Sequence, residues 1–228
     1  MSPSLPRILK QIALFKTIWF NFRYFPFGTA LRFPVVVCRH TRFFKMGGRV
    51  RIDAPVKTFM LFIGLKSLST SDRLSNTVWD VSGEVVVKGR TVFGQGSKIS
   101  VGEGASMVLG NNFMTVGDCK LICHKGLVFG SDCLVSWDVL VMDTDFHHVF
   151  DENGELANAP APISVGNHVW IGCRSTLLKG ISIADGCVIS ASSLITRSFT
   201  EPDCIIGGQG KNASVLKRGI SWSDKLFR

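Results

Sequence analysis

Apolar residues recur at every sixth position along two stretches of this chain, one running from Val81 to Val141 and one from Val165 to Ile195. A turn-forming Gly, Asp, Asn or Ser often follows the apolar position. Neither an α-helix nor a hairpin sheet keeps a period of six over such a length. The sixth positions are Val81, Val87, Phe93, Ile99, Ala105, Asn111, Gly117, Cys123, Phe129, Val135 and Val141, and then Val165, Ile171, Leu177, Ile183, Ile189 and Ile195.

A period of six fits a parallel β-coil, in which each hexad gives one short extended stretch with an inward aliphatic side chain and one corner. Three hexads close a coil, and stacked coils satisfy one another's backbone groups. Asn111 and Gly117 break the apolar rule, so the register between Ala105 and Cys123 stays open. The sequence predicts a mainly β protein. Its predicted parts are a capping segment (1–60), a parallel β-helix (61–206) with an excursion loop (143–162), and a tail (207–228).

The net charge of +9 is concentrated in the predicted capping segment. Residues 1–60 contain eleven Lys and Arg but a single acid, Asp53, whereas the rest of the chain carries 15 basic and 16 acidic residues. Nine of the seventeen Phe also lie in this segment, and a 4-3-4-3 spacing predicts an amphipathic helix. Its apolar stripe comprises Ile8, Ile12, Phe15, Trp19 and Phe22, beside Arg7, Lys10 and Lys16.

Two interpretations of this helix stay open. Basic residues and aromatics together favour adsorption to an anionic cytoplasmic membrane surface. Alternatively, the helix caps the open end of the coil or packs between subunits, as solenoids require. Nucleic-acid binding is disfavoured because the basic excess ends with this segment. No run approaches the eighteen or so apolar residues of a membrane span.

Seven cysteines, an odd number, are scattered along the chain without paired metal-type spacing apart from Cys119 and Cys123. Several fall at or near inward positions of the hexads. This pattern predicts buried thiols in a reducing compartment and not a disulfide framework. We therefore expect a cytoplasmic protein, with the inner face of the membrane as a further option.

The excursion loop interrupts the hexads with DTDFHHVFDENGELANAPAP, which contains the adjacent pair His147 and His148. An imidazole suits proton removal from a hydroxyl or amine that attacks a carbonyl carbon. Asp143 and Asp145 are near enough in sequence for one of them to orient the ring. The loop is therefore the predicted catalytic element.

Residues 127–197 resemble the hexapeptide-repeat acyltransferases, the left-handed β-helix family that includes galactoside and maltose acetyltransferases. The resemblance rests on DTDFHH, on NGE at positions 153–155, on the proline-rich return, and on ISVGNHVWIGCRSTLLKGISIADGCVISASSLITR. Members that act in capsule and lipopolysaccharide synthesis are similar in style, with a basic, aromatic N-terminal region. The family implies a left-handed prism, a homotrimer with sites between subunits, acetyl-CoA as donor and a loop histidine as base.

By position, the family's base falls on His147, with His148 as second choice because the loop lengths differ. The positions that match the family's CoA site are Trp170 of the VWIG motif, Cys173, Ala191, Thr196 and Arg197. The family's proline-containing end of this segment is altered here to GGQGKNAS, residues 207–214, which leaves Lys211, Lys217 and Arg218 to meet the phosphates.

These features predict direct acetyl transfer from acetyl-CoA to a sugar hydroxyl in bacterial surface polysaccharide synthesis. The acceptor would be lipid-linked if the N-terminal helix lies on the membrane. N-acetylation of an amino sugar and a non-catalytic scaffold are alternatives. A zinc carbonic anhydrase using His124, His147 and His148 lacks proper ligand spacing, so no metal is expected.

Overall fold

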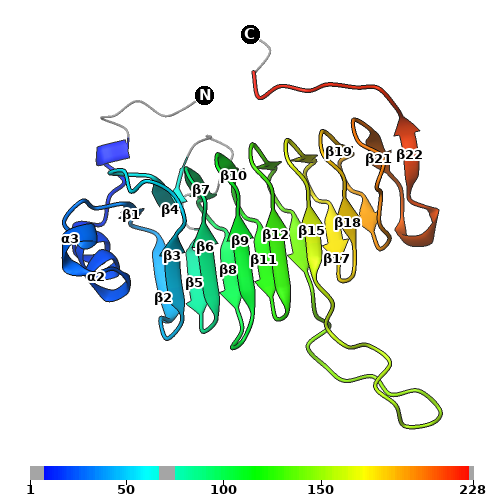
Figure 1. The fold of residues 1–228 in the computed structure, drawn as a ribbon, viewed down its shortest axis with the longest axis horizontal. Coiled ribbons are helices and arrows are strands. Elements are labelled where there is room, and N and C mark those ends of the chain that lie inside the picture. Colours follow the sequence, from blue (N-terminus) through cyan, green and yellow to red (C-terminus); the bar gives the residue numbers. More distant parts are fainter. Residues whose placement is uncertain (1–7, 67–74, 226–228) are drawn as a thin grey trace.

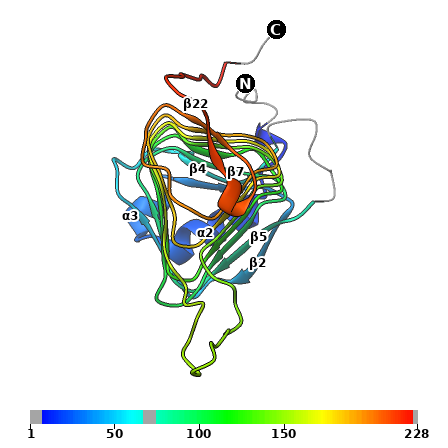
Figure 2. The same cartoon turned by 90° about the vertical axis from the view of Figure 1, so that its right-hand side faces the viewer.

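The computed structural model describes residues 8–66 and 75–225, which form a three-sided prism of stacked parallel coils (Figure 1; Figure 2, along the stack). The fold is a left-handed parallel β-helix in which each coil contributes one strand to each of three sheets. Sheet I contains β1 (Val35–Val37), β4 (Leu61–Leu65), β7 (Thr91–Gly94), β10 (Phe113–Thr115), β13 (Leu134–Val135), β16 (Trp170–Ile171), β19 (Val188–Ile189), β21 (Ile205–Gly207) and β22 (Ser214–Lys217).

Sheets II and III form the other two sides of the prism. Sheet II contains β2 (Thr41–Lys45), β5 (Thr77–Val81), β8 (Lys98–Val101), β11 (Lys120–Cys123), β14 (Leu140–Met142), β17 (Thr176–Leu178) and β20 (Leu194–Ile195). Sheet III contains β3 (Arg49–Ile52), β6 (Glu84–Val87), β9 (Ser106–Leu109), β12 (Gly126–Phe129), β15 (Ile163–Val165) and β18 (Ser182–Ile183). Neighbouring strands pair in parallel except β22, which runs antiparallel to β21 after the short helix η1 (Gly210–Asn212).

Buried side chains at paired positions form one inward column on each sheet, which is the arrangement that a period of six predicts. The columns are Phe93, Thr115, Val135, Ile171 and Ile189 in sheet I; Ile99, Leu121, Val141, Leu177 and Ile195 in sheet II; and Val87, Leu109, Phe129, Val165 and Ile183 in sheet III. A row of aromatic rings adds to this core. Trp79 contacts Phe93, Phe93 contacts Phe113, and Phe113 contacts Phe129.

The hexad register fails in the middle coils, where Leu109, Thr115 and Leu121 take the inward positions. Asn111 and Gly117 lie instead in corners between strands, and Asn111 is exposed, whereas Ala105 directly precedes β9 and is buried in the core. The cause is coil length. Val87 pairs with Leu109, 22 residues later, whereas Val165 pairs with Ile183, 18 residues later. The extra residues widen the corners and shift the inward set.

The N-terminal segment packs at one end of the stack as α2 (Leu14–Tyr24) and α3 (Phe27–Ala30) (Figure 1). Strands begin at Val35, so the first coil starts earlier than the predicted boundary at residue 61. The helix is also shorter than the predicted stripe, because Ile12 forms an antiparallel bridge with Cys38 before α2 begins.

The inward face of α2 carries Thr17 and Asn21 beside Phe20, and it meets the free edge of sheet I. Val37 N donates to Thr17 Oγ1 at 3.0 Å, and Asn21 Nδ2 donates to Val35 O at 2.8 Å. These side chains satisfy backbone groups of β1 that would otherwise lack a neighbouring strand. Phe20, between them, is fully buried against Trp79, so the structure supports the capping interpretation of the helix.

Candidate active site

The histidine-bearing loop leaves the prism at the corner between sheets II and III (Figure 1). β14 ends at Met142 and β15 begins at Ile163, so the loop comprises residues 143–162. Asp143 at its start is fully buried, and its carboxylate accepts the backbone N–H groups of His124, Lys125 and Gly126 at 2.6, 2.8 and 2.7 Å. Both oxygens of Asp143 therefore fix the corner of the preceding coil.

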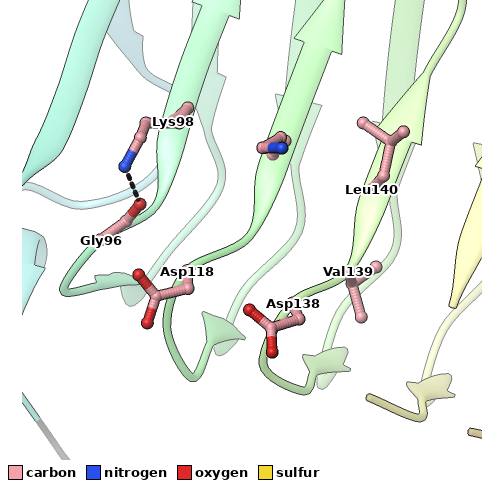
Figure 3. Close-up of a pocket in the computed structure, with 7 residues that line it drawn as sticks. Gly96, Lys98, Asp118, Asp138, Val139 and Leu140 are labelled. Atoms are coloured by element: carbon pink, nitrogen blue, oxygen red, sulfur yellow. Dashed lines mark hydrogen bonds between the residues drawn. The ribbon is translucent and has the colours of Figure 1, made fainter. Parts of the chain in front are cut away.

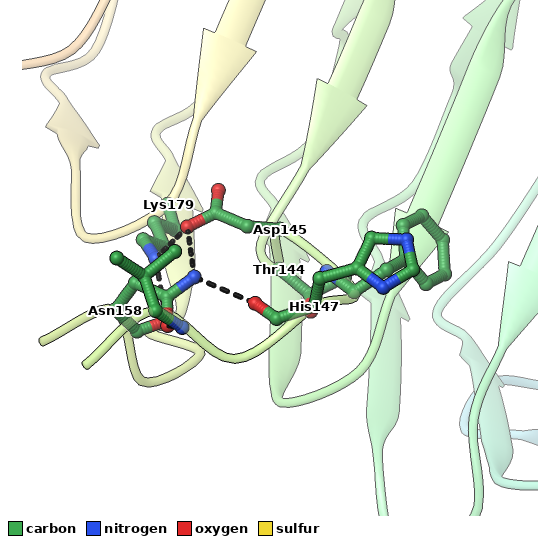
Figure 4. Close-up of polar contacts among 7 residues, drawn as sticks. Thr144, Asp145, His147, Asn158 and Lys179 are labelled. Carbon is green, nitrogen blue, oxygen red and sulfur yellow. Dashed lines mark hydrogen bonds and ion pairs between the residues drawn. The ribbon is translucent and has the colours of Figure 1, made fainter. Parts of the chain in front are cut away.

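Asp145 lies in a polar cluster that crosses the neck of the loop (Figure 4). Its carboxylate pairs with Lys179 of the next coil and accepts from Asn158 Nδ2 at 3.0 Å. Asn158 Nδ2 also donates to His147 O at 2.8 Å, and Lys179 Nζ donates to Asn158 O at 2.7 Å. The hydrogen bond from Lys179 lowers the pKa of Asp145 below its usual value. The cluster thus holds the backbone of His147 in place.

The His147 ring is exposed and points away from the Asp145–Lys179 pair (Figure 4). His148 is also exposed, and its ring centroid lies 6.0 Å from that of Phe150. Among residues 8–66 and 75–225, no carboxylate accepts a hydrogen bond from either imidazole. Asp145 therefore positions the loop backbone in this chain, and the ring-orienting role predicted for Asp143 or Asp145 is not seen.

The residues predicted to contact CoA are distributed over several sides of the prism. Thr196 and Arg197 follow β20 at the same corner as the loop, two coils further along. Cys173 and Ala191 lie at the corner between sheets I and II, and Trp170 points outward from sheet I. A single chain therefore brings only part of the predicted CoA set to the side that carries His147.

Polar contacts already hold some of these residues. Arg197 Nε donates to Ala213 O at 3.0 Å, and its guanidinium lies over the Phe199 ring. Trp170 is 37% exposed, and its Nε1 donates to Ser136 Oγ at 2.9 Å. Lys211, in η1, is exposed.

Sequence reasoning did not assign a role to Trp222, which docks the C-terminal segment onto the prism. The Trp222 ring stacks on His168 with centroids 4.3 Å apart, and its Nε1 donates to His168 O at 2.8 Å. It also lies 6.0 Å from the Trp170 ring. Lys179 and Asn158 were missed as well. Lys179 meets Asp145 only when coils stack, and Asn158 reaches Asp145 and His147 only when the loop folds back on itself.

A cavity of about 310 Å³ opens on sheet II, away from the loop corner (Figure 3). It is lined by Gly96, Lys98, Asp118, Lys120, Asp138, Val139 and Leu140. Lys98 Nζ donates to Asn76 O at 2.6 Å, and Asp118 accepts from Ser75 Oγ. Burial lowers the pKa of Lys98, and the charge of Lys120 adds to this effect while Asp118 opposes it. Lys98 and Asp118 are thus already partnered, and the mixed charges of the lining point to no particular chemistry.

All seven cysteines are free thiols, and Cys173 alone is partly exposed. Burial raises the pKa of Cys38, Cys119 and Cys123 to about 12. Because the thiolate is the reactive form, a thiol reagent should label Cys173 in the folded protein and the other six only after unfolding. Mass spectrometry after brief labelling would measure this. Modification of several cysteines in the folded state would contradict the buried arrangement.

No three His, Cys, Asp or Glu side chains within the described ranges gather in a way that could hold a metal ion. In this single chain, His124 contacts the ring of Phe146 and forms no such group with His147 and His148. The described helices also include none long and apolar enough to cross a bilayer.

The chain is thus a left-handed β-helix that carries the repeat of the bacterial hexapeptide transferases, whose family profile matches residues 162–197. It is 29% identical over 107 residues to the galactoside O-acetyltransferase of Escherichia coli K12, an alignment that covers 46% of this chain and 51% of that protein. It is also 29% identical over 138 residues to the polysialic acid O-acetyltransferase of Escherichia coli O1:K1, covering 60% of this chain and 42% of the relative. The chain therefore spans about half the length of these curated relatives.

The fold is also similar to that of a solved acetyltransferase. The crystal structure of the polysialic-acid-specific acetyltransferase NeuO superimposes with a TM-score of 0.51 and 21% identity, covering 84% of this chain and 79% of the other. At this identity the match supports the β-helix fold.

Proposed function

We propose that this protein transfers an acetyl group from acetyl-CoA to a sugar hydroxyl in the synthesis of a bacterial surface polysaccharide such as capsule or lipopolysaccharide. The observation that carries the proposal is the loop that presents His147 at a corner of the hexapeptide-repeat coil. Relatives named as O-acetyltransferases of galactoside and of polysialic acid support a sugar hydroxyl as acceptor. N-acetylation of an amino sugar is the alternative, because a histidine base serves an amine equally well.

His147 is the proposed general base. Acetyl-CoA, when bound, supplies the acetyl group as an activated thioester. The His147 imidazole accepts the proton of the acceptor hydroxyl while the hydroxyl oxygen bonds to the acetyl carbon. A backbone N–H stabilises the oxyanion that develops. When the carbon–sulfur bond breaks, His147 returns the proton to the thiolate, so the histidine ends as it began.

The proposed assembly is a homotrimer with sites between subunits. Its support is the distribution of the predicted CoA residues, since Trp170 and Cys173 lie on a different side of the prism from His147. A neighbouring subunit could bring the two sets to one cleft. The exposed Lys211 and Lys217 suit the phosphates of CoA, and the exposed face of Trp170 suits an apolar portion.

We further propose a cytoplasmic location at the inner face of the membrane, with a lipid-linked glycan as acceptor. Buried free thiols fit a reducing compartment. The N-terminal segment supplies the support for the membrane, since it combines a basic excess with exposed aromatic side chains.

Release of the CoA thiol tests the proposed reaction directly. The purified protein would be incubated with acetyl-CoA and a panel of free sugars, nucleotide sugars and lipid-linked glycans. We expect release that depends on an acceptor and a product carrying one additional acetyl ester. Absence of release with every acceptor, together with absence of acetyl-CoA binding, would favour a non-catalytic scaffold. An amide product would select the N-acetyltransferase alternative.

A further inference from the structure

The helix that caps the coil presents its apolar side to solvent. Thr17, Phe20 and Asn21 face β1 and the core, whereas Phe15 is 87% exposed and Trp19 is 50% exposed. α3 continues this surface, since Phe22 and Phe27 are in ring contact and both are exposed. We define the outer helical face as Leu14, Phe15, Ile18, Trp19, Phe22, Phe27 and Leu31, all of them exposed.

The outer helical face indicates a binding partner, because its apolar side chains are exposed. In an ordinary surface helix the apolar side chains face the core, and polar side chains such as those of Thr17 and Asn21 face water. In this chain Thr17 and Asn21 hydrogen-bond to the free edge of β1, so the apolar side of the helix faces solvent. Contiguous apolar surface on a folded protein marks an interaction site.

The surrounding charge identifies the kind of partner. The first acidic residue of the chain is Asp53, so α2 and α3 carry no negative charge. Exposed cations on and around the two helices are Lys10, Arg23, Arg32, Arg39, Arg42 and Lys45. Contact between two copies through this face would bring like charges together, whereas an anionic lipid surface would neutralise them while its acyl region accepts the aromatics.

We propose that the outer helical face docks on an anionic lipid bilayer. The helices α2 and α3, which carry this face, lie at the end of the coil stack opposite the end that carries β22 (Figure 1). The stack would then stand on the membrane by its N-terminal end. In the proposed trimer, coils parallel to the threefold axis would place three such faces at one plane and strengthen binding by multivalency.

If the proposed function holds, this orientation also sets how far from the bilayer the acceptor sugar must lie. The loop with His147 follows β14, four strand steps from β2 in sheet II. At about 4.8 Å per step, the loop base lies roughly 19 Å further from the bilayer than the first coil. The sugar that reacts would therefore stand away from the lipid headgroups, as in an extended lipid-linked glycan.

Vesicle co-sedimentation of the full chain tests the docking without CoA or sugar, so its result is independent of the transfer reaction. Vesicles of phosphatidylcholine alone would be compared with vesicles that also contain phosphatidylglycerol. We expect binding to the anionic vesicles that weakens with added salt. Phe15→Ser and Trp19→Ser should each reduce the partition coefficient by about tenfold, because each removes a large buried apolar area from the bound state.

The matched control is Leu216→Ser, which removes an exposed apolar side chain from β22 at the opposite end of the stack. It should leave vesicle binding unchanged. Light scattering on each variant would report the oligomeric state. The proposal would be overturned if the wild-type protein did not bind anionic vesicles, or if Leu216→Ser reduced vesicle binding as much as Phe15→Ser and Trp19→Ser do. Dissociation of the oligomer by Trp19→Ser would also overturn it, since the face would then be a contact between copies of the chain.

Discussion

Replacement of His147 by Ala is expected to lower kcat/KM for acetyl transfer by about 10³-fold, in the middle of the range for removal of a general base. Without the imidazole, the acceptor hydroxyl must lose its proton to water while it attacks. Acetyl-CoA binding should stay close to wild type, because the His147 ring is exposed and projects away from the polar cluster at the loop neck. Initial rates of CoA thiol release and a separate binding titration would measure the two effects.

His148→Ala is the matched control for this prediction. The two histidines are adjacent, both exposed and on the same loop, so either substitution should leave the fold intact. The backbone of His147, unlike that of His148, accepts a hydrogen bond from Asn158 and is thereby tied to Asp145 and Lys179. We therefore expect only a small loss with His148→Ala. A large loss there with an active His147→Ala protein would move the base to His148.

The hexad pattern predicted the fold because each coil imposes the same requirement for one inward side chain per sheet. It worked best from Val165 to Ile195, where coils have the length of three hexads and every period position is buried. It failed at Asn111 and Gly117, because extra corner residues change the register without any local signal. Pairing between coils, and not periodicity, decides which residue points inward there.

The orientation of the N-terminal helix could not be predicted from its amphipathic pattern. Such patterns assume that the apolar side is buried. The free edge of β1, with unpaired backbone groups, instead requires polar partners, and Thr17 and Asn21 supply them. Only Phe20 of the helix's aromatic residues enters the core completely. Of the predicted apolar stripe, Phe15, Trp19 and Phe22 face outward, whereas Ile8 and Ile12 are partly buried and pack against a small core cluster.

The loop was predicted from its composition and motif, but its internal contacts were not. Asp145 is close to His147 in sequence, which suggested a carboxylate that orients the ring. In the structure the Asp145 carboxylate instead pairs with Lys179, 34 residues later, because the stacking of coils places Lys179 beside the loop neck. A contact of this kind depends on the coil register and has no signature in the local sequence.

Asp143→Asn is expected to destabilise the protein by about 3 kcal/mol, because hydrogen bonds to a charged group contribute roughly 1.5–3 kcal/mol each and a buried unpaired donor adds a penalty. The three N–H groups of residues 124–126 converge on the two carboxylate oxygens, which leaves no place for an amide NH₂. Either orientation of an asparagine side chain directs its donors at a backbone N–H. For a chain of this size the melting temperature should fall by about 6–12 °C.

Asp138→Asn is the control, because Asp138 also lies at a coil corner but is exposed. It should change the melting temperature little, as surface substitutions do. Urea unfolding followed by circular dichroism would give the free energies for both variants. Asp143 also begins the loop, and its backbone carbonyl accepts a hydrogen bond from Ala161 N at 3.1 Å. Its substitution should therefore loosen the base of the loop and lower the rate of acetyl transfer even at temperatures below the melting temperature. Equal stabilities of the two variants would show that the buried carboxylate does not organise this corner, and the preformed position of His147 would then need another cause.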